Sequence, residues 1–77
     1  MTQNILKTAV IGLGRIAWSD HLPALLRHPG KFQVTAVVDP ISDRCRDTCA
    51  KFHVPAGYTS LEELLAHQTP DLVIVAF

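Results

Sequence analysis

Short apolar runs alternate with amphipathic segments along the whole chain. The main runs are continuously apolar instead of alternating with polar residues, which is typical of parallel strands covered on both faces. The predicted strands lie at 8–12, at 32–38, very briefly within 54–58, and at 71–77. The amphipathic segments that predict helices lie at about 15–28, 42–52 and 60–69.

The order of these elements is β-α-β-α-β-α-β, which predicts right-handed crossovers and one parallel sheet. The predicted fold class is therefore α/β, a doubly wound parallel sheet. Only its first four strands and three helices are present, and a complete six-stranded fold of this kind needs a longer chain than 77 residues. We expect the fold to be incomplete at its C-terminus.

Two of the predicted helices carry clear local signals. Pro23 lies inside the first helix, and because it lacks an N–H it predicts a kink or a restart near 19–22. Gly30 is expected to end that helix in a left-handed conformation. Ser60 and Glu63 have the spacing of a capping box at the start of the third helix. The leucines expected to form the apolar face of this third helix are Leu61, Leu64 and Leu65.

The turn after the first strand carries the motif G-x-G-x-x-A, which runs Gly12-Leu13-Gly14-Arg15-Ile16-Ala17. Gly12 lets the backbone turn sharply, Gly14 leaves room for a pyrophosphate, and Ala17 lets the helix pack closely on the sheet. Free N–H groups and the helix dipole then favour phosphate groups. The candidate cofactor contacts in this motif are Gly12, Leu13, Gly14, Arg15 and Ile16. Arg15 either adds charge at this site or points to solvent.

An acidic residue, Asp39, ends the second strand at about the separation expected for a dinucleotide-binding unit. A carboxylate there accepts the two ribose hydroxyls of adenosine and repels a 2′-phosphate. No basic residue follows directly, so we predict NAD as the cofactor, with NADP disfavoured. Residues 1–77 are then the N-terminal part of a Rossmann domain. The competing interpretation is a tight βα turn at Gly12 and Gly14, with Asp39 as a cap.

The last predicted strand ends at Ala76 and Phe77. In this topology the strand order reverses between the first and the fourth strand, and ligands bind beyond the carboxyl ends at that point. Both residues are therefore candidates for contact with the cofactor, and Phe77 also for the substrate side. The alternative is that they belong to an ordinary core strand.

Composition narrows the class of protein further. The chain has seven basic and seven acidic residues, so it shows no charge pattern for binding nucleic acid or a membrane surface. No targeting segment or membrane-spanning run is visible, which predicts a cytoplasmic protein. Cys45 and Cys49 lie one helical turn apart and are expected to be reduced thiols packed on the sheet. Cys45, Cys49 and His53 follow one another at intervals of four residues, as metal ligands on one helix face would. A zinc site needs a fourth ligand, and none is evident, so no metal site is predicted.

Taken together, these segments resemble the Gfo/Idh/MocA oxidoreductases. The resemblance covers nearly the whole chain and depends on the order of several short motifs. These are Ala9 to Ala17, His21 to Leu25, Val37 to Pro40, Tyr58 to Leu65 and Asp71 to Ala76.

The resemblance implies NAD(P)-dependent hydride transfer at a hydroxyl or carbonyl carbon of a sugar, polyol or related substrate. It implies that Gly12, Gly14 and Ile16 line the pyrophosphate and that Asp39 holds the ribose. The family's E-K-P lysine, its later catalytic lysine and histidine, and its second, α+β domain have no counterpart in these residues. No catalytic residue is therefore assigned, and any homo-oligomer interface is expected in the absent domain. The alternatives are a non-catalytic NAD-binding sensor or an inactive truncated fragment.

Overall fold

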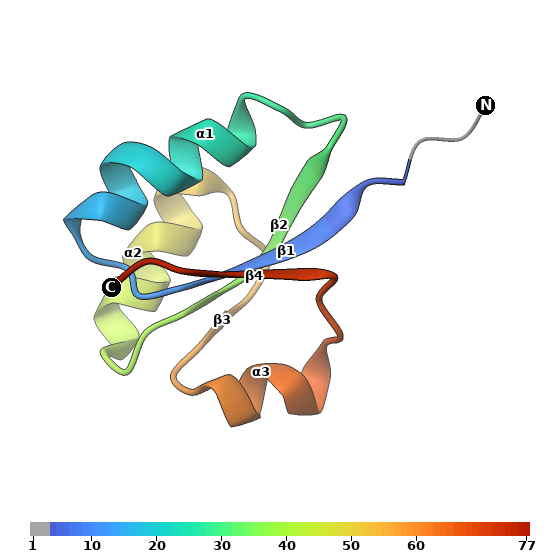
Figure 1. Ribbon diagram of the computed structural model, residues 1–77. Coiled ribbons are helices and arrows are strands. Elements are labelled where there is room, and N and C mark those ends of the chain that lie inside the picture. Colours follow the sequence, from blue (N-terminus) through green and yellow to red (C-terminus); the bar gives the residue numbers. More distant parts are fainter. Residues whose placement is uncertain (1–3) are drawn as a thin grey trace.

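The computed structural model describes residues 4–77, which form one parallel sheet with helices on both of its faces (Figure 1). The strands are β1 (Leu6–Ile11), β2 (Phe32–Val38), β3 (Gly57–Tyr58) and β4 (Leu72–Val75). The helices are the π-helical turn η1 (Ala17–His21), α1 (Leu22–Leu26), α2 (Ser42–Phe52) and α3 (Leu61–His67). The predicted order of elements and the α/β class are confirmed.

The strands lie in the order β3-β2-β1-β4, so β1 is flanked by β2 on one side and β4 on the other. Ile11 at the end of β1 is level with Val38 of β2 and Val75 of β4. All pairings are parallel, so the carboxyl ends of these three strands meet at one edge. The chain reverses its direction of winding at β1, which places the topological switch point between β1 and β4.

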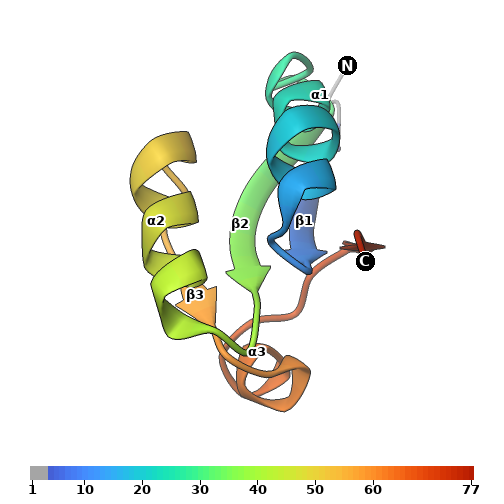
Figure 2. The same cartoon turned by 90° about the vertical axis from the view of Figure 1, so that its left-hand side faces the viewer.

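The sheet carries a core on each face. Helices η1, α1 and α2 cover one face and α3 lies on the other (Figures 1 and 2). Ala9 and Val10 are both fully buried although they point to opposite faces. This two-sided burial explains why β1 is continuously apolar.

Pro23 shapes the first helical segment as the sequence predicted. Residues 15–26 are helical throughout, but the turn at 17–21 is wound as a π-helix. The N–H of Leu22 donates to the carbonyl of Ala17, five residues back. Regular α-helix resumes at Leu22, with Pro23 in its first turn, where a missing N–H costs little.

The prediction of a left-handed Gly30 is wrong. Helix α1 ends at Leu26, and Arg27 follows it with an ordinary right-handed backbone. Among residues 4–77, the positive φ angles belong to Gly12 and His53. His53 is the C-cap of α2, with a φ of 57° and a ψ of 42°. A left-handed residue was not predicted at this position because glycine is the usual residue there, and α2 is followed by a histidine.

Helix α3 begins with the predicted cap but buries less than predicted. The Oγ of Ser60 accepts the N–H of Glu63 at 3.1 Å, while the Glu63 carboxylate accepts the N–H of Thr59 instead of that of Ser60. Leu64 is fully buried, whereas Leu61 and Leu65 are 43% and 56% exposed. The predicted three-leucine face is therefore wrong for two of its members, because α3 turns only Leu64 onto the sheet.

No helix among residues 4–77 combines the length and the apolar character needed to cross a membrane.

The left-handed conformation of His53 leads to a stability prediction. An L-residue is strained in this region and glycine is not, so His53→Gly should raise the free energy of unfolding by about 0.5–1 kcal/mol. Ala50→Gly is the matched control, because Ala50 is an exposed residue inside α2. It should lower the free energy of unfolding by about 1 kcal/mol. Urea unfolding followed by circular dichroism measures both, and equal destabilisation by the two variants would contradict the prediction.

Candidate cofactor site

The turn between β1 and η1 requires glycine at position 12 for two reasons. Its φ is +89°, a conformation that L-residues rarely adopt. A Cβ there would also lie 3.0 Å from Cδ1 of Phe77. The N–H of Gly12 donates to the carbonyl of Val38 at 2.8 Å and so ties the turn to the end of β2. The sharp turn predicted from the sequence is present.

Gly14 has a different surrounding. A Cβ placed on it would meet no protein atom within 4 Å, so its lack of a side chain keeps a space open in front of the turn. The helical run begins directly after it, at residue 15. The first N–H groups of a helix have no partner within that helix, and they carry its positive dipole end. Ala17 is fully buried and packs the helix against the sheet.

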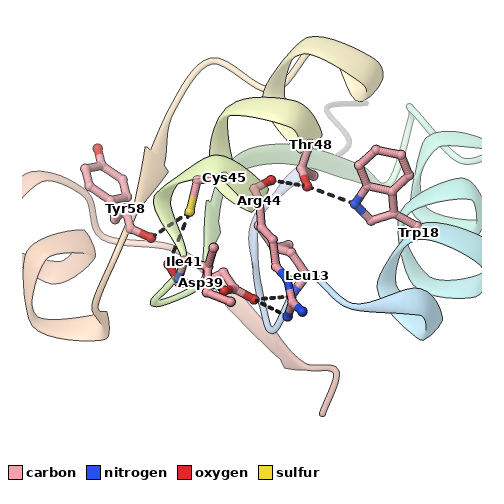
Figure 3. Close-up of polar contacts among 8 residues, drawn as sticks. All are labelled: Leu13, Trp18, Asp39, Ile41, Arg44, Cys45, Thr48 and Tyr58. Carbon is pink, nitrogen blue, oxygen red and sulfur yellow. Dashed lines mark hydrogen bonds and ion pairs between the residues drawn. The ribbon is translucent and has the colours of Figure 1, made fainter.

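Asp39 follows β2 and is 3% exposed. One carboxylate oxygen, Oδ2, accepts the N–H of Leu13 at 2.9 Å, and Oδ1 accepts the N–H of Ile41 at 2.9 Å (Figure 3). Burial by itself raises the pKa of this carboxyl. The two N–H donors and the charge of Arg44 outweigh burial, so the pKa of Asp39 lies below its ordinary value. The carboxylate is ionised at neutral pH.

Arg44 lies in the first turn of α2 and faces this carboxylate. Its guanidinium nitrogen is 3.7 Å from Oδ2 of Asp39, and its side chain is 52% exposed. The carbonyl of Arg44 accepts the hydroxyl of Thr48, and that hydroxyl accepts the indole N–H of Trp18 at 2.9 Å (Figure 3). This chain of hydrogen bonds links η1 to α2.

A cavity of about 610 Å³ opens at the carboxyl ends of the strands. All eight residues that the sequence analysis nominated for the cofactor line it, together with three further residues that it did not nominate. The nominated residues are Gly12, Leu13, Gly14, Arg15, Ile16, Asp39, Ala76 and Phe77. The further residues are Pro40, Ile41 and Arg44. Arg44 lies five positions after Asp39, and no periodic pattern in the sequence marks it as a neighbour of that carboxylate.

Ala76 and Phe77 lie just beyond β4, which ends at Val75 and is shorter than predicted. The N–H of Ala76 still donates to the carbonyl of Ile11 at 2.8 Å, and Ala76 is buried. Phe77 is 92% exposed and lies against Gly12. Both residues line the cavity.

The two cysteines are free and lie outside this cavity. The Cys45 thiol is buried in the core, where it donates to the carbonyls of Asp39 and Tyr58. Burial raises the pKa of both thiols, which keeps them protonated and unreactive. Within residues 4–77 no three His, Cys, Asp or Glu side chains converge as a metal site would require.

The residues around the cavity suit a dinucleotide. Gly14 leaves the open space that a phosphate needs to approach a helix start closely, and Arg15 adds a cation at its rim. Each oxygen of Asp39 accepts one N–H and retains a lone pair for a hydroxyl group. Apolar side chains, including those of Ile41 and Phe77, complete the walls.

Solved structures of dehydrogenases share this fold. The WlbA dehydrogenase from Chromobacterium violaceum, in complex with NADH and UDP-GlcNAcA, has a TM-score of 0.87 and 27% identity, over 100% of this chain and 22% of its own. The 3-ketoreductase KijD10 from Actinomadura kijaniata, in complex with NADP and TDP-benzene, has a TM-score of 0.75 and 30% identity, over 94% of this chain and 21% of its own.

A third structure agrees in fold. It is scyllo-inositol dehydrogenase from Lactobacillus casei with bound NAD(H) and scyllo-inositol, which has a TM-score of 0.82 and 15% identity, over 96% of this chain and 22% of its own. The chain thus spans little more than a fifth of these proteins, 21–22% of their length. A comparison with curated protein sequences gives no match.

A sequence profile of an oxidoreductase family with an NAD-binding Rossmann fold, named for Gfo, Idh and MocA, matches residues 6–77. The match includes β1, the Gly12–Gly14 turn, Asp39 and β4. The chain therefore belongs to the Gfo/Idh/MocA family of NAD-binding oxidoreductases.

Proposed function

We propose that residues 4–77 hold the adenosine and pyrophosphate half of NAD(H) in an enzyme that transfers hydride to or from a sugar, polyol or related substrate. The observation that carries this proposal is the single cavity shared by the Gly12–Gly14 turn, Asp39 and the end of β4. Membership of the family indicates NAD as the cofactor and oxidoreduction as the class of reaction.

The pyrophosphate belongs at the start of the helical run. Its charge is balanced by the N–H groups of the first turn and by the helix dipole, since the chain as a whole is neutral. Leu13, Gly14 and Ile16 form the wall there, and Arg15 supplies a nearby cation. A phosphate can approach this backbone closely because Gly14 has no side chain.

The adenosine ribose belongs at Asp39. The ionised carboxylate accepts the two ribose hydroxyls and disfavours a 2′-phosphate at the same position. Ala76 and Phe77 contribute a further part of the wall. Phe77 is the residue proposed for the substrate side. NAD(H) is therefore preferred over NADP(H).

The cofactor supplies the hydride chemistry when bound, and these residues bind and orient it. No residue among 4–77 is proposed as a general acid or base. The substrate class rests on the neighbouring enzymes, which were crystallised with UDP-GlcNAcA and with scyllo-inositol. A second domain is proposed to shape the substrate site and any homo-oligomer interface, and the location of the enzyme is proposed to be cytoplasmic. No observation favours a non-catalytic sensor or an inactive fragment over this proposal.

Gly14 provides a test that separates binding from folding. Gly14→Ala adds a Cβ that meets no protein atom, so the free energy of unfolding should change by less than about 0.5 kcal/mol. The same methyl group enters the proposed pyrophosphate space, so the Kd for NAD⁺ should rise roughly tenfold or more, which corresponds to about 1.4 kcal/mol. Calorimetric titration and thermal unfolding measure the two effects.

Gly57→Ala is the reciprocal control. Its Cβ would lie 3.0 Å from Cβ of Cys45, and neither Gly57 nor Cys45 lines the cavity, so the variant should lower stability and leave the NAD⁺ affinity of the folded molecules unchanged. Unchanged NAD⁺ affinity in Gly14→Ala would refute the proposed position of the pyrophosphate.

Asp39 tests the choice of cofactor. The wild-type chain should bind NAD⁺ at least about tenfold more tightly than NADP⁺, and Asp39→Ala should lose most of the NAD⁺ affinity together with this preference. Calorimetric titration with each nucleotide measures the affinities, and circular dichroism checks that the variant is folded. Equal affinity of the wild-type chain for NAD⁺ and NADP⁺ would contradict the role given to the Asp39 charge.

A further inference from the structure

The Asp39 carboxylate makes two hydrogen bonds to backbone groups of the chain itself. The donors belong to two different loops, since Leu13 lies in the turn after β1 and Ile41 in the connection from β2 to α2. Both donor–acceptor distances are 2.9 Å, and the carboxylate side chain is only 4% exposed. The side chain thus connects the two loops that form the cavity wall.

The bond to Leu13 is the longer-range of the two. Leu13 and Asp39 are 26 positions apart in sequence, and Leu13 is itself buried, with 3% of its surface exposed. A buried N–H without an acceptor is strongly unfavourable, and a bond from an N–H to an ionised carboxylate is stronger than one to a neutral group. Removing the charge at Asp39 therefore removes a force that fixes the Gly12–Gly14 turn.

Arg44 is the ionisable group that balances this buried charge. It stands 3.7 Å from the same oxygen, Oδ2, that accepts the Leu13 N–H. Other groups around Asp39 are Arg15, which lines the same cavity from the turn, and Cys45, whose thiol donates to the Asp39 carbonyl. From β3, the carbonyl of Tyr58 accepts the Asp39 N–H at 3.1 Å.

We propose that Asp39 is a positioning residue as well as a ribose ligand: with Arg44 as its counter-ion, it holds the phosphate-binding turn in place before the cofactor arrives. This inference rests on the proposed function, in which the Gly12–Gly14 turn binds the pyrophosphate. Donor and acceptor of both hydrogen bonds belong to this chain, so the bonds are testable without any nucleotide.

The titration of Asp39 in the free chain provides the first measurement. The amide signals of Leu13 and Ile41 are followed by NMR as the pH of the full 77-residue chain is lowered from 7. Both signals should move with one shared midpoint below the ordinary aspartate pKa of about 3.9, because one carboxylate serves both donors. Arg44→Gln should raise this midpoint, and Arg44→Lys should return it toward the wild-type value.

Arg46→Gln is the matched control. Arg46 lies on the same helix, is 72% exposed and pairs with Asp43 and Asp47, so its loss should leave the midpoint unchanged. A purely structural effect of removing an arginine from α2 would shift both variants alike.

Hydrogen exchange at neutral pH provides the second measurement. Asp39→Asn should speed exchange of the Leu13 amide by roughly tenfold or more, while the core amide of Val37 stays protected. If this variant does not fold, the Arg44→Gln and Arg46→Gln comparison decides. Separate midpoints for Leu13 and Ile41, or unchanged Leu13 exchange in a folded Asp39→Asn chain, would overturn the proposal. Because no nucleotide is present, failure here is distinct from a failure to bind NAD⁺.

Discussion

The central position of β1 between β2 and β4 is the constraint on which the site depends. Because the three strands are parallel and in register at Ile11, Val38 and Val75, their following residues meet at one edge. Gly12 and Asp39 continue two of these strands. Residues 26 or more positions apart in the chain are thereby brought into one cavity.

Hydrogen bonds at this edge of the sheet hold the residues that line the cavity in place. The backbone turn at Gly12 is fixed by the hydrogen bond from its N–H to the carbonyl of Val38. The next residue, Leu13, is fixed by the Asp39 carboxylate. The acidic residue assigned to the ribose is thus also part of the architecture of the turn. The hydrogen bond that ties its carboxylate to Leu13 is one of the interactions that lower its pKa against the effect of burial.

Much of this arrangement was predictable from the sequence, because two-sided burial, turn glycines and helix breakers leave strong local signals. The element order, the restart at Pro23 and the Ser60 cap are confirmed. Predictions that depended on tertiary packing were less accurate. Leu65 matched a helical apolar face but is exposed, since the orientation of α3 depends on the neighbouring strands and not on its own periodicity.

The structure also revealed features without a local signature. Gly30 looked like a left-handed stop, yet that conformation occurs at His53, where the capping geometry of α2 overrides residue preference. The sequence predicted Asp39 either as a ribose ligand or as a cap, and it did not predict the carboxylate's hydrogen bond to the turn at Leu13. Partners such as Arg44 and Leu13 are set by loop geometry, which periodicity does not encode.

Whether the cofactor occupies this cavity can be read from an NMR titration of the ¹⁵N-labelled chain with NAD⁺. The largest amide shifts are expected at residues 12–16, 39–41, 44 and 76–77, which line the cavity. Residues at the opposite end of the strands, such as Lys7 and Gln68, should not shift. An absence of shifts in a folded chain, or shifts concentrated at Lys7 and Gln68, would contradict the assignment of this cavity to the cofactor.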